Sequence, residues 1–317
     1  MNVCVVGATG AFGRKHLDAI REIEGVRVTA MVSPEQDKLD QLITEYGHDS
    51  KGFTNLSDAL ALDEVEAVIL ATPTQMHAAQ AIECMEAGKH VLVEIPMADN
   101  IEDSYRVVEA QKKSGKVAMA GHTRRFNPSH QWIQNKIAAG ELHIQQMDVQ
   151  TYFFRRTNTN AKGEARCWTD HLLWHHACHT VDLFQYQTGE QATKLQALQG
   201  PIHPDLGIAM DMSIGMKVPS GAICTLSLSF NNDGPFGTFF RYICEEGTYL
   251  ARYDDLYDGK ENLISLEGVA VSNNGIELID REFFDAIKTG REPNSSVASC
   301  LPAMETLDKL EQLLEAE

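Results

Sequence analysis

The fold is decided by residues 2–16, NVCVVGATGAFGRKH. The stretch opens with an apolar, mostly β-branched run, and such a run that ends in glycine is typical of a buried parallel strand. Gly7, Gly10 and Gly13 follow in a G-x-x-G-x-x-G spacing. Glycines there let the backbone turn tightly and approach a pyrophosphate bound at the N-terminus of the next helix, here over roughly residues 11–24. Between a strand and a helix the motif indicates dinucleotide binding, and the alternative is an ordinary glycine turn.

Working outward, strand-like runs alternate with helical patterns as far as about residue 122. The runs lie at 26–32, 65–71, 90–95 and 116–121, and the helical patterns lie at 35–46, 75–87 and 101–114. This alternation predicts an α/β fold, with a Rossmann doubly wound parallel sheet that binds NAD(P) over residues 1–122.

Beyond residue 122 the pattern changes to longer strands. They are expected at 145–154, 208–218, 221–230 and 238–244, and NNDGPFG should turn between the last two. We predict a C-terminal α+β domain over 123–317 with a large, mostly antiparallel open sheet, which binds substrate and forms oligomers. An amphipathic helix over 297–314 is a candidate to pack back on the first domain.

Composition limits the possible partners. The net charge of −18 argues against binding to nucleic acid or to an anionic membrane, and an anionic substrate would need a local basic pocket. The seven cysteines are scattered without a C-x-x-C pair, which fits reduced thiols. There is no signal-peptide pattern and no apolar run long enough to span a membrane. We expect a cytoplasmic protein that acts on a small molecule.

The end of the second strand indicates which dinucleotide is bound. NAD-preferring proteins usually have Asp or Glu there, to bind the ribose 2′-hydroxyl. The sequence is TAMVSPEQDK, and Met31, Val32 and Ser33 occupy the expected positions. Ser33 could instead donate to a 2′-phosphate, so the sequence favours NADP, with NAD as a poorer substitute.

The segment DHLLWHHACHTVDLF, residues 170–184, is rich in histidine and has helical spacing. His175 and His179 should lie one turn apart on one face, with Asp182 one turn further, while His176 lies about 100° round the helix. Such histidines could bind a metal, transfer protons or belong to a polar structural helix. A zinc site needs a third protein ligand, so no metal is expected.

Several segments together resemble one family: GATGAFGRKH, ATPTQMHAAQAIECMEAGKHVLVEIPMA, GHTRRFNP and the histidine segment. They are similar to the glucose–fructose oxidoreductase / inositol dehydrogenase (Gfo/Idh/MocA) family of two-domain NAD(P) oxidoreductases, from residue 1 to the terminal helix. With Ser33 included, the expected cofactor contacts are Gly7, Thr9, Gly10, Ala11, Phe12, Gly13, Ser33, Thr72, Pro73, His77, Glu94 and Pro96.

Two departures from the family matter. The family usually has Glu-Lys-Pro after the fourth strand, and its lysine positions substrate and relays protons, but this chain has Glu94-Ile95-Pro96. The family often has Asp four residues before its catalytic histidine, and here that position is His175. The proton-handling groups therefore look rebuilt around imidazoles.

The segments GHTRRFNPSHQ, QQMDVQTYFFRR, WTDHLLWHHACHTVDLF and SLSFNNDGPFGTFFRYI carry a closer likeness to a member that oxidises the cyclic hemiacetal of a ring-opened, carboxylate-bearing semialdehyde. His179 matches the catalytic histidine of the family and is the expected base, and His175 could orient it, share the proton or hold a substrate carboxylate. Arg124 is the expected carboxylate ligand, because the arginine fork binds carboxylates in a bidentate way. His122, Trp168, Asp170 and His171 are further candidates to line the substrate pocket.

Other readings remain open. Arg125 matches an arginine that is often structural, Asp182 either fixes a histidine tautomer or is structural, and at most one of Arg155 and Arg156 faces the site. A sugar or inositol dehydrogenase is one alternative, although the Lys and Asp that would mark it are absent. A catalytically silent NADP sensor is another. We expect a homodimer or homotetramer formed through the C-terminal sheet.

Overall fold

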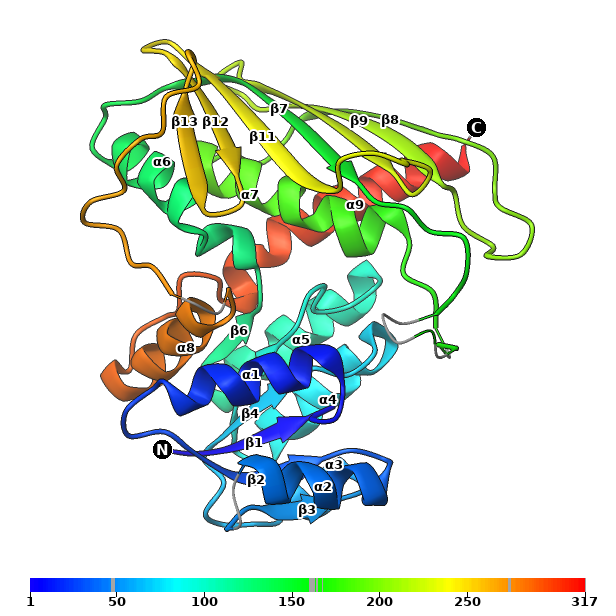
Figure 1. The fold of residues 1–317 in the computed structure, drawn as a ribbon, viewed down its shortest axis with the longest axis vertical. Coiled ribbons are helices and arrows are strands. Elements are labelled where there is room, and N and C mark those ends of the chain that lie inside the picture. The colour runs from blue at the N-terminus through cyan, green and yellow to red at the C-terminus, as the bar shows by residue number, and fades with distance from the viewer. Residues whose placement is uncertain (47–48, 160–162, 164, 167, 273–274, 317) are drawn as a thin grey trace. The chain divides into compact units, whose positions relative to one another are not determined.

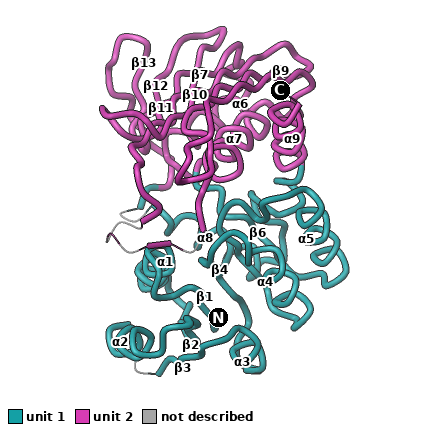
Figure 2. The backbone as a smooth tube through the Cα atoms, turned by 90° about the vertical axis from the view of Figure 1, so that its right-hand side faces the viewer, with its two compact units in different colours: residues 1–123, 271–301 teal, residues 124–270, 302–317 magenta. Residues whose placement is uncertain are grey.

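The computed structural model describes residues 1–317 except 47–48, 160–162, 164, 167, 273–274 and 317 (Figure 1). The chain divides into two compact units (Figure 2). Unit 1 comprises Met1–Thr123 and Val271–Leu301, and unit 2 comprises Arg124–Ala270 and Pro302–Glu317. The chain therefore leaves unit 1 after Thr123, returns to it at residue 271, and leaves it again after Leu301 to end in unit 2.

A six-stranded parallel sheet forms the centre of unit 1, in the order β3-β2-β1-β4-β5-β6. The strands are β1 Asn2–Val6, β2 Arg27–Val32, β3 Lys51–Phe53, β4 Ala67–Leu70, β5 His90–Val93 and β6 Ala118–Ala120. The direction of winding reverses between β1 and β4, and open sheets of this kind bind ligands there, at the carboxyl ends of the strands. The predicted doubly wound sheet is confirmed.

The helices of unit 1 are α1 Ala11–Arg21, α2 Gln36–Tyr46, α3 Leu56–Leu60, α4 Thr74–Glu86, α5 Ile101–Ser114 and α8 Glu277–Thr289. Capping residues determine where helix α5 begins and ends. The side chain of Asn100 accepts a hydrogen bond from the Asp103 amide at the start of α5, and Gly115 ends that helix in the left-handed region. Three elements of unit 1, β3, α3 and α8, are not predicted by the sequence pattern.

Helix α8 belongs to unit 1 although it follows nearly all of unit 2 in the chain. It packs beside α1 (Figure 1) and buries Ile279 and Phe283. Near it, the Ser295 hydroxyl donates to the carbonyl oxygen of Ala120 at the end of β6. A late segment is therefore in a position to supply residues to the carboxyl edge of the first sheet.

Unit 2 contains a seven-stranded sheet in the order β13-β12-β11-β7-β10-β9-β8. The strands are β7 Ile144–Tyr152, β8 Lys194–Gln199, β9 Asp211–Lys217, β10 Ile223–Ser229, β11 Gly237–Cys244, β12 Thr248–Arg252 and β13 Asp255–Asp258. Only β7 and β10 pair in parallel, which confirms the predicted mostly antiparallel sheet. Strands β8, β12 and β13 were not predicted.

One predicted turn is wrong. NNDGPFG does not join neighbouring strands, because β7 lies between β10 and β11: Val149 of β7 pairs with Leu226 on one side and with Phe240 on the other. Strand β7, which comes earlier in the chain, forms backbone hydrogen bonds with β10 on one side and with β11 on the other. Turn residues between β10 and β11 do not reveal that a third strand separates them.

Helices cover one face of this sheet. They are α6 Pro128–Ala138, α7 Cys178–Thr188 and the part of α9 Val297–Glu315 that belongs to unit 2 (Figure 1). The covered face carries buried side chains such as Met147 and Leu228, and alternate positions such as Gln150 and Thr225 face outward. In the described part of the chain, no helix combines the length and apolar character needed to cross a membrane.

Candidate functional site

Two close backbone approaches shape the glycine loop. Gly7 has φ +74°, and a Cβ added to it would lie 2.4 Å from the carbonyl oxygen of Ala71, just after β4. A Cβ on Gly13 would lie 2.2 Å from the carbonyl oxygen of Gly7. Neither position accepts a side chain, because packed backbones cannot move apart cheaply. The loop of residues 7–13 therefore lies against the ends of β1 and β4, and no side chain at Gly7 or Gly13 covers its backbone. We call this loop the glycine cradle.

The N-terminus of α1 suits an anion. Gly10 is the N-cap residue, no side chain of the described residues caps the helix, and its first turn holds no acidic residue. Ala11 and Phe12 are exposed there. The first amide groups of the helix and its dipole are thus left for a phosphate. The three glycines fit the dinucleotide that the motif implies.

Ser33 follows β2 and contacts the glycine loop. Its hydroxyl oxygen lies 2.7 Å from that of Thr9, and Ser33 is buried. The amides of Gly7 and Ala8 both donate to the carbonyl oxygen of Val32, at 2.9 and 3.2 Å, and tie the end of β2 to the loop. Two of the predicted cofactor contacts therefore form one hydroxyl pair.

His77 links the predicted contacts after β4 with those after β5. Its Nδ1 lies 2.8 Å from the carbonyl oxygen of Pro96, and its Nε2 lies 2.8 Å from that of Thr72. Burial lowers the pKa of His77, so a neutral ring donates to one of the two carbonyls. Pro73 is the N-cap residue of α4. His77 therefore connects the loop that follows β4 to the loop that follows β5.

Glu94 has partners that the sequence analysis missed. His16 Nε2 lies 3.0 Å from Glu94 Oε1, and His16 Nδ1 lies 2.8 Å from Asp280 Oδ1. All three residues are buried. Burial alone would lower the pKa of His16, but the charges and hydrogen bonds of Asp280 and Glu94 raise it to about 10. His16 lies within the quoted loop segment and could have been noticed, whereas nothing in the sequence points to Asp280.

The histidine segment is helical, as predicted, but its first turn is not an α-helix. Leu172–Ala177 form a π-helical turn, and α7 begins at Cys178. His175 therefore lies in the π turn and His179 in the first turn of α7. Such turns are rare and occur frequently at functional sites. Residue spacing cannot reveal the change of helix type.

One hydrogen bond favours a particular tautomer of His175. Its Nδ1 accepts a hydrogen bond of 3.2 Å from the backbone amide of His171. A nitrogen that accepts carries no proton, so this contact favours the neutral ring with its proton on Nε2. The ring stacks on Trp168 with centroids 5.4 Å apart, and His171 contacts it edge-on at 4.9 Å. Three predicted residues thus form one ring cluster. His179 is half-buried.

Asp170 joins a group of cations. It forms salt bridges with Arg155, with Arg166 at 2.7 Å and with His176 Nε2 at 3.1 Å. Burial would raise the pKa of Asp170, but the hydrogen bonds and charges of His176 and Arg155 hold it well below its usual range. Arg166 also lies 5.3 Å from the Trp168 ring centroid, which connects this group to the ring cluster. Arg156 turns away, toward the exposed Phe154.

The two neighbouring arginines have different surroundings. Arg125 binds Asp182 through Nε at 2.8 Å and Nη2 at 2.6 Å, and both side chains are buried. Arg124 lies between the rings of Phe240 and Tyr253, at 5.9 and 5.6 Å, and forms no salt bridge with a described residue. Burial lowers the pKa of Arg124. Arg124 is half-buried, and a partly desolvated guanidinium without a carboxylate partner is a place to bind one.

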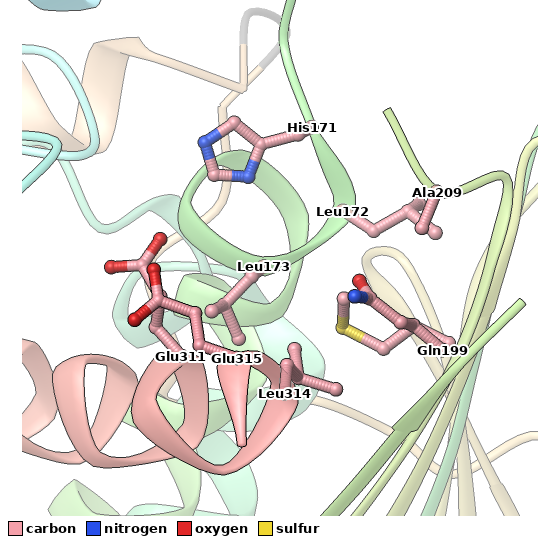
Figure 3. Close-up of a pocket in the computed structure, with 9 residues that line it drawn as sticks. His171, Leu172, Leu173, Gln199, Ala209, Glu311, Leu314 and Glu315 are labelled. Atoms are coloured by element: carbon pink, nitrogen blue, oxygen red, sulfur yellow. The ribbon is translucent and has the colours of Figure 1, made fainter. Parts of the chain in front are cut away.

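His171 also lines a cavity of about 150 Å³ in unit 2 (Figure 3). Its other lining residues are Leu172, Leu173, Gln199, Ala209, Met212, Glu311, Leu314 and Glu315. Two carboxylates line this cavity, so it does not suit a carboxylate ligand. His122, the remaining predicted substrate residue, is buried after β6 in unit 1.

The fold and the glycine cradle define a dinucleotide-dependent oxidoreductase. Residues 1–122 match the oxidoreductase family with an NAD-binding Rossmann fold, and residues 128–270 match the C-terminal domain of bacterial oxidoreductases. The chain belongs to the Gfo/Idh/MocA family of oxidoreductases and is a dehydrogenase.

Two curated relatives bear on its activity. The chain is 62% identical over 317 residues to the 4-carboxy-2-hydroxymuconate-6-semialdehyde dehydrogenase of Sphingobium sp. (strain NBRC 103272 / SYK-6), and the match covers 100% of both chains. It is 34% identical over 257 residues to an inositol 2-dehydrogenase of Corynebacterium glutamicum (strain R), covering 80% of this chain and 73% of the relative.

Solved structures show the same fold. The WlbA dehydrogenase of Bordetella pertussis, in complex with NADH and UDP-GlcNAcA, superposes with a TM-score of 0.85 at 20% identity, covering 100% of this chain and 96% of the other. An oxidoreductase of Agrobacterium radiobacter, in complex with NAD+, L-tartaric acid and magnesium, gives a TM-score of 0.84 at 15% identity, covering 99% and 96%.

The Arg125–Asp182 pair allows a test of the two readings of Asp182. Asp182→Asn leaves the buried Arg125 charge uncompensated, so we expect the free energy of unfolding to fall by about 3–5 kcal/mol. Urea denaturation followed by circular dichroism measures this, with Asp255→Asn on the exposed β13 as the matched control. Unchanged stability together with a large loss of kcat would show instead that Asp182 acts on a histidine.

Proposed function

We propose that the protein oxidises the cyclic hemiacetal of 4-carboxy-2-hydroxymuconate-6-semialdehyde to 2-pyrone-4,6-dicarboxylate, with NADP as the cofactor. The full-length likeness to the Sphingobium enzyme carries the proposal, because it extends through the histidine segment and the arginines of unit 2. This reaction belongs to the protocatechuate 4,5-cleavage pathway of aromatic and lignin catabolism.

The reaction requires two transfers from the substrate. The C–H bond of the hemiacetal carbon breaks with loss of a hydride, and the O–H bond of its hydroxyl breaks with loss of a proton. The carbon–oxygen bond becomes the carbonyl of the lactone. NADP+, when bound, accepts the hydride. The protein must therefore orient the hemiacetal and take up one proton.

His179 is proposed as the base that takes up this proton. Imidazole has a reference pKa of about 6.5 and suits proton transfer near neutral pH. His175 supports it as a neutral hydrogen-bond donor, because its Nδ1 is engaged by the His171 amide and its proton is on Nε2. Trp168 and His171 fix the plane of the His175 ring. A neutral donor next to the base does not repel an anionic substrate.

The substrate carboxylates are proposed to bind cationic groups of unit 2. Arg124 is the principal ligand, because it is a half-buried cation that contacts two aromatic rings and the Asn127 amide oxygen and has no salt bridge with a described residue. Asp170 contributes by holding Arg155 and Arg166, so its own role is to organise cations. His122 is retained as a further pocket residue.

The glycine loop, the Thr9–Ser33 hydroxyl pair and the loops held by His77 are proposed to bind the dinucleotide. Ser33 supports NADP, because a hydroxyl can donate to a 2′-phosphate where a carboxylate would repel it. Phe12, Thr72, Pro73, Glu94 and Pro96 complete the proposed set. NAD should serve as a poorer substitute.

A homodimer or homotetramer formed through the sheet of unit 2 is also proposed. Its outer face is covered by no described helix and exposes Leu198 and Ile223.

An inositol or sugar dehydrogenase is the second candidate, favoured by the inositol 2-dehydrogenase relative. The family resemblance assigns such enzymes a lysine and an aspartate at positions that here are Ile95 and His175. A neutral polyol also carries no charge that could pair with the cations around Asp170.

The first experiment compares the substrates directly. The semialdehyde is generated with a ring-opening dioxygenase, and the reduced-nicotinamide absorbance is followed with NADP+ and NAD+ in parallel. We expect reduction that is faster with NADP+, in keeping with Ser33. Reduction with myo-inositol but not with the semialdehyde would select the second candidate, and cofactor binding without any turnover would select a sensor.

His179→Asn tests the base. We expect kcat to fall by about 10²–10⁴-fold while the cofactor Kd stays unchanged, because only proton removal is lost. His143→Asn, at an exposed position, serves as the matched control. Near-normal turnover by a folded His179→Asn protein would remove His179 from the mechanism.

Arg124→Met tests carboxylate binding. A charge-assisted hydrogen-bond pair is lost, so KM for the semialdehyde should rise by roughly 10–100-fold without a change in cofactor Kd. Arg252→Met removes a half-exposed arginine in the same unit as the control. An unchanged KM in the folded Arg124 variant contradicts the assignment.

A further inference from the structure

In the buried triad of His16, Glu94 and Asp280, Glu94 is a proposed cofactor contact, but His16 and Asp280 have no role in the proposed chemistry. The triad draws on three distant segments of unit 1: α1, the end of β5, and α8. His16 is wholly buried and contacts a carboxylate on each side, at 3.0 and 2.8 Å. No lysine or arginine of the described chain forms a salt bridge with either carboxylate. Such a triad is costly to bury, so its placement needs an explanation.

The charge of the triad does not cancel. The raised pKa of His16 keeps its ring an imidazolium at neutral pH. Burial raises the pKa of Asp280, and the charge and hydrogen bond of His16 act against that rise and favour the ionised carboxylate. With both carboxyl groups ionised, one positive and two negative charges leave a formal charge of −1. The neighbouring Glu277 is paired with Arg281 at 2.6 Å and adds no net charge. A single excess negative charge is therefore fixed inside unit 1.

Glu94 places this charge at the carboxyl edge of the sheet. Its backbone amide donates to the carbonyl oxygen of Leu70, beside the strand end that meets Gly7. Of the three side chains, that of Glu94 is the one with exposed area, 9% against 0% for the others. Ile95 donates its amide to Glu94 Oε2 at 3.3 Å, and Gly121 leaves its Cα face open to the carboxyl group. The carboxylate is held rigidly where a ligand can approach it.

The strand order assigns this edge to one half of a dinucleotide. A sheet in the order 3-2-1-4-5-6 binds the two nucleotide halves on opposite sides of the switch point, with the adenosine ribose at the end of β2. Ser33 marks the adenosine side here. The end of β5, where Glu94 lies, is therefore on the nicotinamide side.

We propose that His16 and Asp280 are positioning residues which hold Glu94 as a fixed carboxylate, and that the net negative charge of the triad favours the positively charged, oxidised nicotinamide over the neutral, reduced ring. The effect promotes binding of the oxidised cofactor and release of the reduced one. It rests on the proposed function only in placing the nicotinamide half near Glu94, and it does not depend on which substrate is oxidised.

The test measures cofactor affinity without substrate. Dissociation constants of NADP+ and NADPH are determined by calorimetry and by nicotinamide fluorescence for the full chain and for Asp280→Asn. The asparagine oxygen can still accept from His16 while the net charge becomes zero. We expect the ratio of Kd for NADP+ to Kd for NADPH to rise about tenfold, as one unit charge at close range predicts.

Asp285→Asn removes the same charge from an exposed position of the same helix and should leave the ratio unchanged. Equal weakening of both cofactors by Asp280→Asn would mean a structural role only and would overturn the proposal, as would an unchanged ratio. Failure of the substrate assignment would leave this measurement intact, because no turnover is involved.

Two further measurements keep the proposal testable if Asp280→Asn does not fold. Glu94→Gln removes the negative charge on the other side of His16 and must shift the ratio in the same direction. In the unmodified protein, nitrogen NMR of labelled histidine must show a His16 imidazolium through neutral pH. A neutral His16 ring would leave two adjacent carboxylates without their cation and would overturn the assignment.

Discussion

The rest of unit 1 depends on one steric constraint, the close approach of Gly13 to the carbonyl oxygen of Gly7. Because a Cβ on Gly13 would lie 2.2 Å from that oxygen, α1 can begin directly against the end of β1. This position of α1 leaves the amides of its first turn to bind a phosphate. It also directs His16, one turn further along the helix, toward Glu94 and Asp280. Phosphate binding and the buried triad are thus two results of one backbone contact.

The two units of this acidic chain place opposite charges at their proposed binding groups. By the proposal above, unit 1 keeps a negative charge beside the nicotinamide half, which carries a positive charge when oxidised. Unit 2 concentrates cations, with Arg155 and Arg166 on Asp170 and Arg124 between two rings. A net charge of −18 would repel a carboxylate substrate at long range, so the attraction has to come from groups desolvated at short range, where it is strongest.

Sequence reasoning succeeds here where the signal is local and fails where it is not. The glycine spacing and the β-branched strands reveal the parallel sheet, because each buried strand and each tight turn is encoded in a few adjacent residues. The return of α8 to unit 1, the insertion of β7 between β10 and β11, and the pairing of His16 with Asp280 are contacts between distant segments. Trp168, His171 and His175 were each predicted as site residues, but their ring cluster and the π-helical turn were not, since hydrophobic spacing does not distinguish a π turn from an α turn.

The departures from the family pattern fit one another physically. A carboxylate substrate would be repelled by an aspartate four residues before the proposed base, and the imidazole of His175, which accepts from the His171 amide, can keep a hydrogen-bond donor there without that repulsion. The family lysine would add a positive charge beside Glu94, and Ile95 omits it, which leaves the triad's negative charge uncompensated. Each replacement alone would look like the loss of a catalytic group. Together they omit positive charge on the proposed nicotinamide side of unit 1, in keeping with the proposal that the arginines of unit 2 bind the substrate carboxylates.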